Sequence, residues 1–365
     1  MDEERLYQVA LTKIPGLGDT LIKNLIAYSG SASQVFKLNK GKLLKCPGIG
    51  QKVASEVLDP SYIKISEEEL IKCDKHHVRT LFYTDEDFPE NLRHAQDSPS
   101  LLYIKGKGTF EHTKRVAIVG TRKATSYGKE ITEEIVKGLQ SYHPVIISGL
   151  AFGIDIEAHR AALSQKLENI SVLAHGLDII YPSQHRSVAE NITENGLIVS
   201  EYGVGVKPET YHFPARNRII AGLTDLVIVV EAAEKGGALI TAEIASSYDR
   251  EVFAVPGSLK MKYSRGCNRL IKQQIAHIYS GIPDLLKVMN WDTRSAVKNK
   301  VVKPVLEPQE EIVYDVLNMN SNGVALDDLS WKSQIGLNKL ASILLSMEFK
   351  GIVRSLPGKK YKIIA

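Results

Sequence analysis

The residues best suited to chemistry lie between positions 211 and 222, where two arginines flank an asparagine in the order Arg216-Asn217-Arg218. Phe213 lies three residues before the first arginine. Guanidinium groups form paired hydrogen bonds to phosphates, and an aromatic ring stacks on an unpaired base with about 1–3 kcal/mol. This combination suits single-stranded nucleic acid. The spacing is equally compatible with a structural role, in which Phe213 is a core residue and the arginines pair with acids at the start of a surface helix.

Further polar and small residues follow strand-like apolar runs. Arg122 comes after the run 116–119, and Ser148-Gly149 follow the run 146–147. In a parallel sheet, free backbone N–H groups gather where strands end and helices begin, and they favour anions. Arg122 at such a strand end therefore shifts the interpretation of residues 211–222 towards binding.

The patterns that would indicate catalysis or a cofactor are missing from the sequence. Gly120 has no partner glycines at dinucleotide-binding spacing, which argues against NAD, and no nucleophile elbow, zinc-protease helix or P-loop occurs. Asp155 and His159 are four residues apart and could form an acid–base pair, but helix capping or an intrahelical hydrogen bond is favoured. We therefore expect a protein without catalytic residues, metal or cofactor.

The elements that position these residues are short Val/Ile-rich runs alternating with helical patterns. They occupy residues 115–119, 145–147, 170–173, 197–199, 226–230 and 252–255. Continuous apolar strands separated by helices predict a parallel sheet covered on both faces, a doubly wound α/β domain over residues 76–290.

Residues 1–75 show apolar residues at helical spacing and predict several short helices. Two similar breaks, Pro15-Gly16-Leu17-Gly18 and Pro47-Gly48-Ile49-Gly50, form an internal repeat of about 32 residues. Each resembles a helix-hairpin-helix unit, which presents backbone N–H groups to a phosphate; a packing module that binds nothing is the alternative. Ser66, followed by three glutamates, is expected to cap a helix.

The C-terminal part begins with a linker at residues 291–307, which lacks apolar periodicity and contains lysines and a proline. Residues 308–365 then predict three helices and a two-stranded ribbon turned at Pro357-Gly358. That order is typical of a winged-helix domain. Its third helix, around residues 337–347, carries Lys339 as its one basic residue, so partner binding or a scaffolding role is favoured over reading a DNA groove.

Composition excludes several classes of protein. The 365 residues are 44% hydrophobic and 24% charged, as in ordinary globular chains, and the formal net charge of +4 does not by itself indicate a nucleic-acid partner. Because the sequence has no membrane-spanning run and its start is acidic, we expect a cytoplasmic protein. The odd number of cysteines, three, predicts free thiols at Cys46, Cys73 and Cys267.

Nearly the whole chain resembles the DNA-processing protein A family, also called Smf, which serves bacterial natural transformation. The similarity is densest between residues 115 and 280, where many family motifs occur in order. They are Val116-Ala-Ile-Val-Gly-Thr-Arg122, Ile147-Ser-Gly-Leu-Ala-Phe-Gly-Ile-Asp155, Phe213-Pro-Ala-Arg-Asn-Arg-Ile-Ile-Ala-Gly222, Ala238-Leu-Ile-Thr-Ala242, Val252-Phe-Ala-Val-Pro-Gly257 and Gly266-Cys-Asn-Arg-Leu-Ile271.

The resemblance implies a sterile-alpha-motif-like (SAM-like) helical domain, an extended Rossmann core and a winged-helix tail. It also implies a homodimer that binds and protects incoming single-stranded DNA and loads the RecA recombinase onto it. The strand-binding residues carried over onto this sequence are Arg122, Ser148, Gly149, Lys207, Phe213, Arg216, Asn217 and Arg218.

This sequence departs from the family pattern at three places. Thr210 stands where the family has a basic residue, and Gly236-Gly237-Ala238 replaces Ser-Gly-Ser, which removes two hydroxyl donors. Asp249 replaces a glycine, at what is expected to be a helix end. The second change puts in doubt whether that loop touches phosphate.

Two other functions compete with strand binding. A glycine-lined Rossmann pocket also suits a nucleoside monophosphate, and Lys235-Gly236-Gly237-Ala238 with Thr241 and Glu243 distantly resembles the loop of phosphoribohydrolases, which release the base. A duplex-binding regulator acting through the tail is the other alternative.

Overall fold

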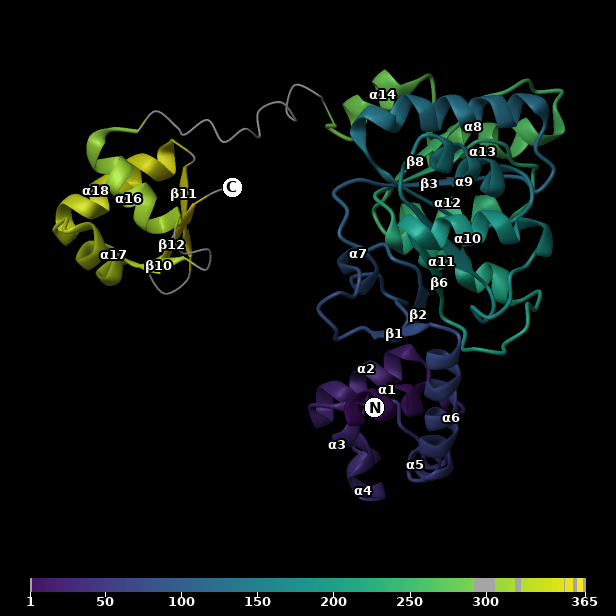
Figure 1. The fold of residues 1–365 in the computed structure, drawn as a ribbon, viewed down its shortest axis with the longest axis horizontal. Coiled ribbons are helices and arrows are strands. Elements are labelled where there is room, and N and C mark those ends of the chain that lie inside the picture. Colours follow the sequence, from purple (N-terminus) through teal and green to yellow (C-terminus); the bar gives the residue numbers. More distant parts are fainter. Residues whose placement is uncertain (1, 292–305, 319–322, 351, 357–359, 364–365) are drawn as a thin grey trace. The chain divides into compact units, whose positions relative to one another are not determined.

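The computed structural model describes residues 2–291, 306–318, 323–350, 352–356 and 360–363. The chain divides into two compact units, residues 1–291 and 292–365, each of which has its own hydrophobic core (Figure 1). Within the described residues, no helix is both long enough and apolar enough to span a bilayer.

The first unit begins with helices, as the sequence predicts. Their bounds are α1 (Glu3–Lys13), α2 (Asp19–Ser29), α3 (Ala32–Phe36), α4 (Lys40–Leu43), α5 (Gln51–Val57) and α6 (Ser61–Lys75). Side chains of Asp2, Ser31 and Asn39 accept backbone N–H groups at the starts of α1, α3 and α4. The prediction that Ser66 caps a helix is wrong: α6 begins five residues earlier, and the Ser66 hydroxyl donates to the Tyr62 carbonyl at 2.7 Å.

A nine-stranded sheet follows in the described chain, in the order β1-β2-β6-β5-β4-β3-β7-β8-β9. The strands are β1 (Arg79–Phe82), β2 (Leu101–Lys105), β3 (Arg115–Val119), β4 (Val145–Ser148), β5 (Asn169–Leu173), β6 (Leu197–Ser200), β7 (Leu226–Val229), β8 (Glu251–Ala254) and β9 (His277–Ile278). Neighbours from β6 to β9 are parallel, whereas β1 and β2 add antiparallel edge strands. The six predicted strands are confirmed to within a residue at each end.

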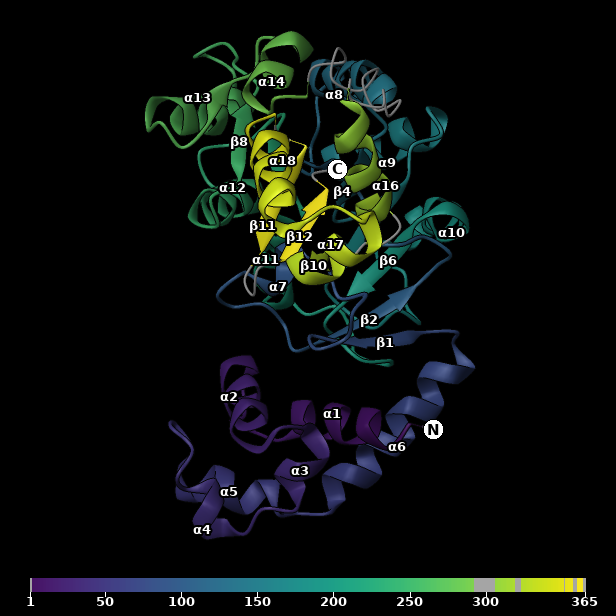
Figure 2. The same ribbon diagram turned by 90° about the vertical axis from the view of Figure 1, so that its left-hand side faces the viewer.

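Both faces of the sheet are covered, which confirms the predicted doubly wound fold. In β3, Val116 and Ile118 pack into one apolar cluster while Ala117 and Val119 pack into another. The helices on the first face are α8 (Ser126–Leu139), α9 (Ile154–Ser164), α10 (Arg186–Asn195) and α14 (Ile282–Val288), and those on the second are α7 (Glu90–Arg93), α11 (His212–Leu223), α12 (Gly237–Ser247) and α13 (Arg265–Lys272) (Figure 2). The first unit also contains short 3₁₀ turns at Gln140–Tyr142, Ser183–His185 and Lys262–Ser264.

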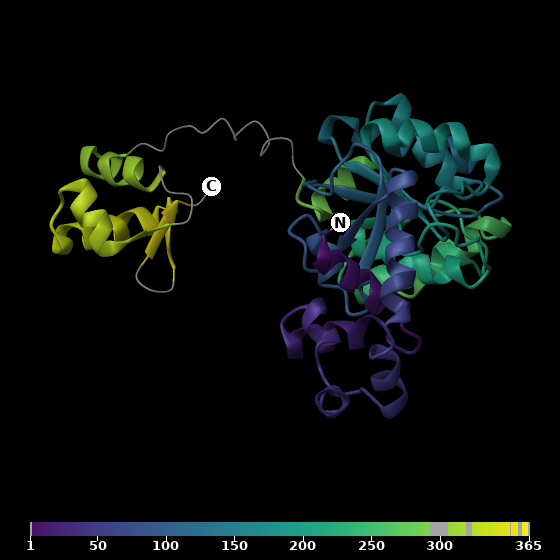
Figure 3. The ribbon, with the colours of Figure 1, turned by 60° about the horizontal axis from the view of Figure 1, so that its bottom comes forward.

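The N-terminal helices dock on the β1–β2–β6 edge through buried polar contacts. The Glu69 carboxylate is almost fully buried, accepts the Val204 backbone N–H at 3.1 Å and lies 3.5 Å from the Lys13 ammonium. Lys13 also donates to the Tyr103 hydroxyl at 3.3 Å. These contacts join α1 and α6 to the strand β2 and to the loop after β6. Figure 3 shows the N-terminal helices, coloured purple to blue, beside the sheet.

The second unit is a winged helix, which confirms that prediction. It contains α16 (Pro308–Asn318), β10 (Val324–Ala325), α17 (Leu326–Ser333), α18 (Leu337–Phe349), β11 (Val353–Leu356) and β12 (Lys360–Ile363). Most of the predicted linker, residues 292–305, and the predicted turn at Pro357-Gly358 lie outside the described residues.

Replacing Glu69 tests this docking. Glu69→Ala leaves the Val204 N–H without its acceptor and Lys13 without its carboxylate, so the free energy of unfolding of the first unit should fall by about 1–3 kcal/mol. Urea denaturation followed by circular dichroism measures it. Glu68→Ala, which removes an exposed neighbour of the same type, is the control and should leave the transition unchanged. Equal midpoints for the two variants would show that the contact does not stabilise the unit.

Candidate functional site

A pocket of about 640 Å³ opens where the strands β3 and β7 end. Its lining comes from the loops after these strands, from the start of α9 and from α11 and α12. This is the edge of a doubly wound sheet at which ligands bind, because strand carboxyl ends and helix amino ends meet there. The pocket therefore lies where the sequence analysis places a binding site.

One face of α11 forms a wall of the pocket. Phe213, Arg216, Asn217 and Ile220 all line it, and their spacing of three, four and seven residues puts them on a single side of a helix. Arg218 is two residues beyond Arg216 and consequently lies on another side. The Arg-Asn-Arg segment is thus divided between two environments.

Arg216 is buried, with 5% of its surface exposed. Its Nη1 donates to the Gly149 carbonyl at 2.8 Å and also to the Val172 carbonyl. Burial lowers the pKa of Arg216 to about 10, against the opposing effect of Asp155, so the guanidinium stays charged at neutral pH. A Cβ on Gly149 would lie 2.2 Å from Arg216 Nη1, so any larger residue there would displace the buried guanidinium.

Asn217 connects Arg216 to α12. Its side-chain oxygen accepts from Arg216 Nε at 3.3 Å, and its Nδ2 donates to the Gly237 carbonyl at 3.2 Å. A continuous set of hydrogen bonds therefore runs from the loop after β4 to the start of α12, and it fixes the pocket wall.

Arg122 lies in the opening of the pocket. Its exposed guanidinium lies over the half-buried ring of Phe213, at 5.1 Å from the ring centroid, and the ring of Tyr181 lies 6.2 Å from that of Phe213. Arginines that form ion pairs within the described residues are Arg5, Arg115, Arg160, Arg218 and Arg269. Arg122 is not among them, so its charge is available to a ligand.

The charged side chains that line the pocket are mainly cationic: Arg122, Arg216 and Lys235 against the single carboxylate of Asp155. Burial raises the pKa of Asp155, while Arg216 and the Ala151 and Gly149 backbone amides oppose the rise. The described lining therefore favours an anion.

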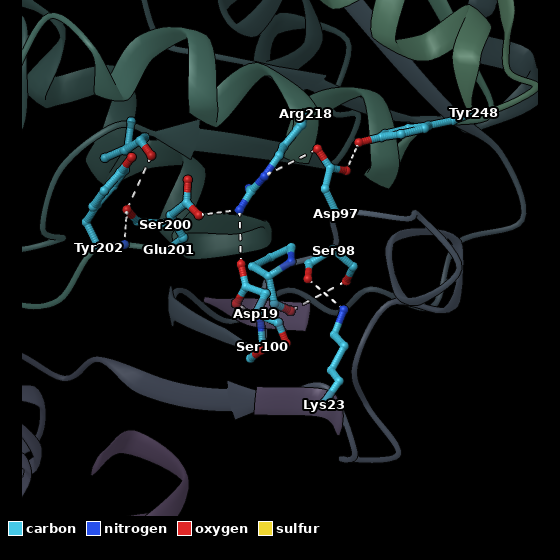
Figure 4. Close-up of polar contacts among 12 residues, drawn as sticks. Asp19, Lys23, Asp97, Ser98, Ser100, Ser200, Glu201, Tyr202, Arg218 and Tyr248 are labelled. Atoms are coloured by element: carbon cyan, nitrogen blue, oxygen red, sulfur yellow. Dashed lines mark hydrogen bonds and ion pairs between the residues drawn. The ribbon is translucent and has the colours of Figure 1, made fainter. Parts of the chain in front are cut away.

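Arg218 does not reach the pocket. It donates to Glu201 at 2.7 Å and lies 3.5 Å from Asp19 of α2 and 3.8 Å from Asp97 (Figure 4). Three carboxylates thus surround this guanidinium, which joins α11 to the N-terminal helices. Pairing with acids, the structural role considered in the sequence analysis, therefore describes Arg218, whereas Arg216 donates to backbone carbonyls.

The remaining residues implied by the family resemblance lie around the pocket. Ser148 is fully buried, and its hydroxyl donates to the Ile118 carbonyl at 2.7 Å inside the sheet. Gly149 is also buried and contributes its carbonyl to Arg216. Lys207 is exposed and precedes Pro208, which lines the pocket, as Thr210 also does. The structure therefore brings Arg122, Phe213, Arg216 and Asn217 together and leaves Ser148, Gly149, Lys207 and Arg218 outside the lining.

Tyr181, Lys235 and Asp155 also line the pocket, although the sequence analysis did not assign them to strand binding. Lys235 could have been found, because it follows β7 much as Arg122 follows β3. Tyr181 reaches the pocket from the loop after β5. Asp155 is not paired with His159, whose Nδ1 lies 2.9 Å from the Asn169 side-chain oxygen.

No group of His, Cys, Asp and Glu side chains suited to a metal occurs in the described parts of the chain. Cys46, Cys73 and Cys267 are buried free thiols, as predicted.

Comparison with known proteins gives consistent matches. Residues 79–290 match the family described as DNA recombination-mediator protein A, and residues 300–359 match the DprA winged helix domain. The chain is 31% identical to Protein Smf of Synechocystis, covering 99% of both chains. It is 37% identical to the DNA processing protein DprA of Streptococcus pneumoniae, covering 75% of this chain and 95% of that one.

Solved structures agree with these matches. The X-ray structure of DNA processing protein A from Streptococcus pneumoniae superposes with a TM-score of 0.68 at 34% identity, covering 79% of this chain and 98% of that chain. A structure of DNA processing protein A from Helicobacter pylori, concerned with its single-stranded DNA binding mode, superposes with a TM-score of 0.53 at 34% identity over 59% of this chain and 96% of the other.

The buried histidine behind the pocket gives a prediction about pH. Burial lowers the pKa of His159 from 6.5 to about 4, against the hydrogen bond to Asn169. Because the folded pKa lies below the unfolded one, the unfolded chain binds the proton first, and stability present above pH 6.5 is lost as the pH falls towards 4. The loss is at most about 1.4 kcal/mol per pH unit.

Histidine-selective NMR measures this pKa directly, and His159→Gln identifies the resonance. We expect a titration midpoint near 4. A midpoint near 6.5 would mean that water or a neighbouring anion stabilises the charged ring.

Proposed function

The chain belongs to the DNA-processing protein A family, and we propose that it acts in DNA processing by binding single-stranded DNA in the pocket between β3, β7 and α11. The observation that supports this most is the exposed Arg122 guanidinium over the Phe213 ring, beside the buried charge of Arg216. A cation for the phosphate and a ring for the base are the two contacts that an unpaired strand needs.

The pocket residues take different roles in this proposal. Arg122 binds a phosphate, because its charge is exposed and carries no ion pair with another described residue. Phe213 and Tyr181 offer ring surface to bases. Arg216 and Asn217 hold the wall in place and add positive potential, and Arg218 keeps α11 attached to the helical segment rather than binding the strand.

Family membership extends the proposal to a place in natural transformation. We infer that the chain protects incoming single strands and loads RecA recombinase onto them, as a homodimer and without breaking bonds. The resemblance described above is the support for these finer roles. The structure of the Helicobacter pylori relative, which concerns single-stranded DNA binding, supports the choice of ligand.

The phosphoribohydrolase alternative receives no support from the geometry. Its acid would be Glu243, which forms an ion pair with Arg269 at 3.2 Å and does not line the pocket. Thr241 donates to the Gly237 carbonyl at 3.2 Å within its own helix. Incubation with nucleoside monophosphates tests this alternative, since release of free base would contradict the proposal.

Removing Arg122 or Phe213 should weaken strand binding. Arg122→Ala should reduce affinity for a single-stranded oligonucleotide about tenfold and change the log–log salt slope by about 0.7, the value for one phosphate contact. Phe213→Ala should cost about 1–3 kcal/mol with the salt slope nearly unchanged, because it removes stacking rather than charge. Fluorescence anisotropy at several salt concentrations measures both effects.

Lys123→Ala is the matched control, because it removes an exposed positive charge next to Arg122 that does not line the pocket. It should bind almost as the unchanged protein does. If Lys123→Ala and Arg122→Ala were equally weak, general electrostatic attraction would explain the binding, and the pocket would not.

RecA loading needs its own assay. RecA filament formation on strands coated with single-strand-binding protein should speed up when the chain is added, and the Arg122→Ala variant should lose most of that effect. Full strand binding without any acceleration of RecA would leave the pocket assignment intact and contradict the loading role.

A further inference from the structure

The N-terminal helices carry a strongly basic surface whose lysines do not line the pocket. Residues 20–55 contain six lysines and no aspartate or glutamate. One of them, Lys23, donates to the Ser98 carbonyl at 2.7 Å and so is used in docking. The other five are exposed and are called the lysine face here: Lys37, Lys40, Lys42, Lys45 and Lys52.

The lysine face is not neutralised by ion pairs within the described residues. The lysines that form such pairs are Lys13, Lys107, Lys129 and Lys350. The acids nearest in sequence, Glu56 and Asp59, accept hydrogen bonds from the Tyr62 hydroxyl and the Ser61 backbone N–H. Glu4 accepts the Ala32 N–H at 2.6 Å. The positive charge of the surface therefore remains available to an external anion.

The lysine face gathers on neighbouring short helices. Lys40 of α4 donates to the Ser55 hydroxyl of α5 at 2.8 Å, which brings these two helices together. Lys45 and Lys52 flank the hairpin between them. In Figures 1 and 2, α3, α4 and α5 lie at the end of the first unit that points away from the sheet, so an extended ligand can approach them.

The two hairpins of the internal repeat pack in equivalent ways. Gly16 and Gly48 both have positive φ, at 79° and 85°. A Cβ on Gly48 would lie 2.6 Å from Leu21, and a Cβ on Gly16 would lie 3.6 Å from Val53, the repeat equivalent of Leu21. Each hairpin thus packs against the helix that follows the other, as two equivalent halves.

The residues after the two hairpins differ in charge. Asp19 and Thr20 follow the first hairpin, whereas Gln51 and Lys52 occupy the equivalent places after the second. Asp19 accepts the Ser100 N–H at 2.7 Å and lies beside Arg218, so the first hairpin is attached to the core (Figure 4). The second hairpin has Gln51 in place of Asp19, followed by a lysine, and its residues Pro47, Gly48 and Gly50 are exposed.

The segment that carries the lysine face, residues 37–52, contains no aromatic side chain that could stack on bases. Phe36 is the one aromatic residue between Tyr28 and Tyr62, and it packs against Tyr7 with ring centroids 5.2 Å apart. A surface with charge but no stacking platform suits a duplex, whose bases are already stacked and whose phosphates are dense. We propose that the lysine face binds the phosphate backbone of double-stranded DNA, without reading its sequence.

This second site is independent of the pocket, so the chain can hold a duplex and a single strand at the same time. The two sites also differ in chemistry. The pocket combines an exposed guanidinium with aromatic rings, whereas the lysine face offers ammonium groups alone. Substitutions in one site should therefore leave binding at the other unchanged.

The test uses the full chain with three lysines neutralised, Lys42→Gln, Lys45→Gln and Lys52→Gln together. Anisotropy of a labelled 20-base-pair duplex should show about a tenfold or greater loss of affinity at low salt, and the log–log salt slope should fall by about 0.9 for each phosphate contact removed. Affinity for a single-stranded oligonucleotide should change less than twofold at moderate salt.

The matched control neutralises three exposed lysines on α6 of the same helical segment, Lys64→Gln, Lys72→Gln and Lys75→Gln. It removes the same charge and should keep duplex affinity. If the lysine-face variant and the α6 variant lost duplex affinity equally, net charge would explain the binding, which would contradict the proposal. Unchanged duplex affinity in the lysine-face variant would also overturn it. Equal losses of duplex and single-strand binding would contradict the choice of duplex.

A second measurement does not depend on how the variant folds. Amine-reactive labelling of the unchanged protein, read by mass spectrometry, should show Lys42, Lys45 and Lys52 protected by duplex. Lys64, Lys72 and Lys75 should stay reactive. Protection of both sets, or of neither, would remove the lysine face as the duplex site.

Discussion

The buried guanidinium of Arg216 is the constraint on which the pocket depends. Desolvating such a charge costs several kcal/mol unless hydrogen bonds and an opposite charge compensate. Here the carbonyls of Gly149 and Val172 accept from it, and Asp155 lies near enough to oppose the lowering of its pKa. Because these partners come from the loop after β4, from β5 and from α9, the guanidinium is satisfied only when all three meet α11 in one arrangement.

That arrangement gives α11 two distinct faces. The face with Phe213, Arg216 and Asn217 lines the pocket, and Arg218 on the other side joins carboxylates that include Asp19 of the helical segment. A displacement of the N-terminal helices would therefore pull on the helix that forms the pocket wall. The polar contacts that attach this segment stabilise the first unit and also hold its binding surface in place.

The sequence predicted the fold better than the site, for physical reasons. Strands such as β3 and β7 are apolar on both faces because helices cover both, and this produces unbroken Val/Ile runs that local composition shows. The predicted cap at Ser66 failed because a serine inside a helix can donate to the carbonyl four residues earlier, so its presence does not mark a helix start.

Local sequence patterns could not predict that Arg216 and Arg218 have different roles. The Arg218 guanidinium meets Asp19, which is 199 residues away in sequence, and no local pattern encodes such a pairing. Arg122 and Phe213 were identified because a strand end and a helix start both mark the same edge of the sheet. The position of a residue at the end of a strand or the start of a helix therefore predicts whether it lies near the pocket. The charged groups with which it pairs can be identified only in the folded structure.

The glycine loop before α12 shows how a departure from the family pattern is compatible with the site. The loop lacks the two hydroxyl groups that the family has there, yet Gly236, Gly237 and Lys235 line the pocket. No side chain caps α12 at Gly236, so the first N–H groups of this 11-residue helix have no side-chain acceptor. The helix dipole places partial positive charge at that end, and Lys235 adds a full one. Backbone amides and an ammonium group thus make this end of the pocket positive without hydroxyl donors.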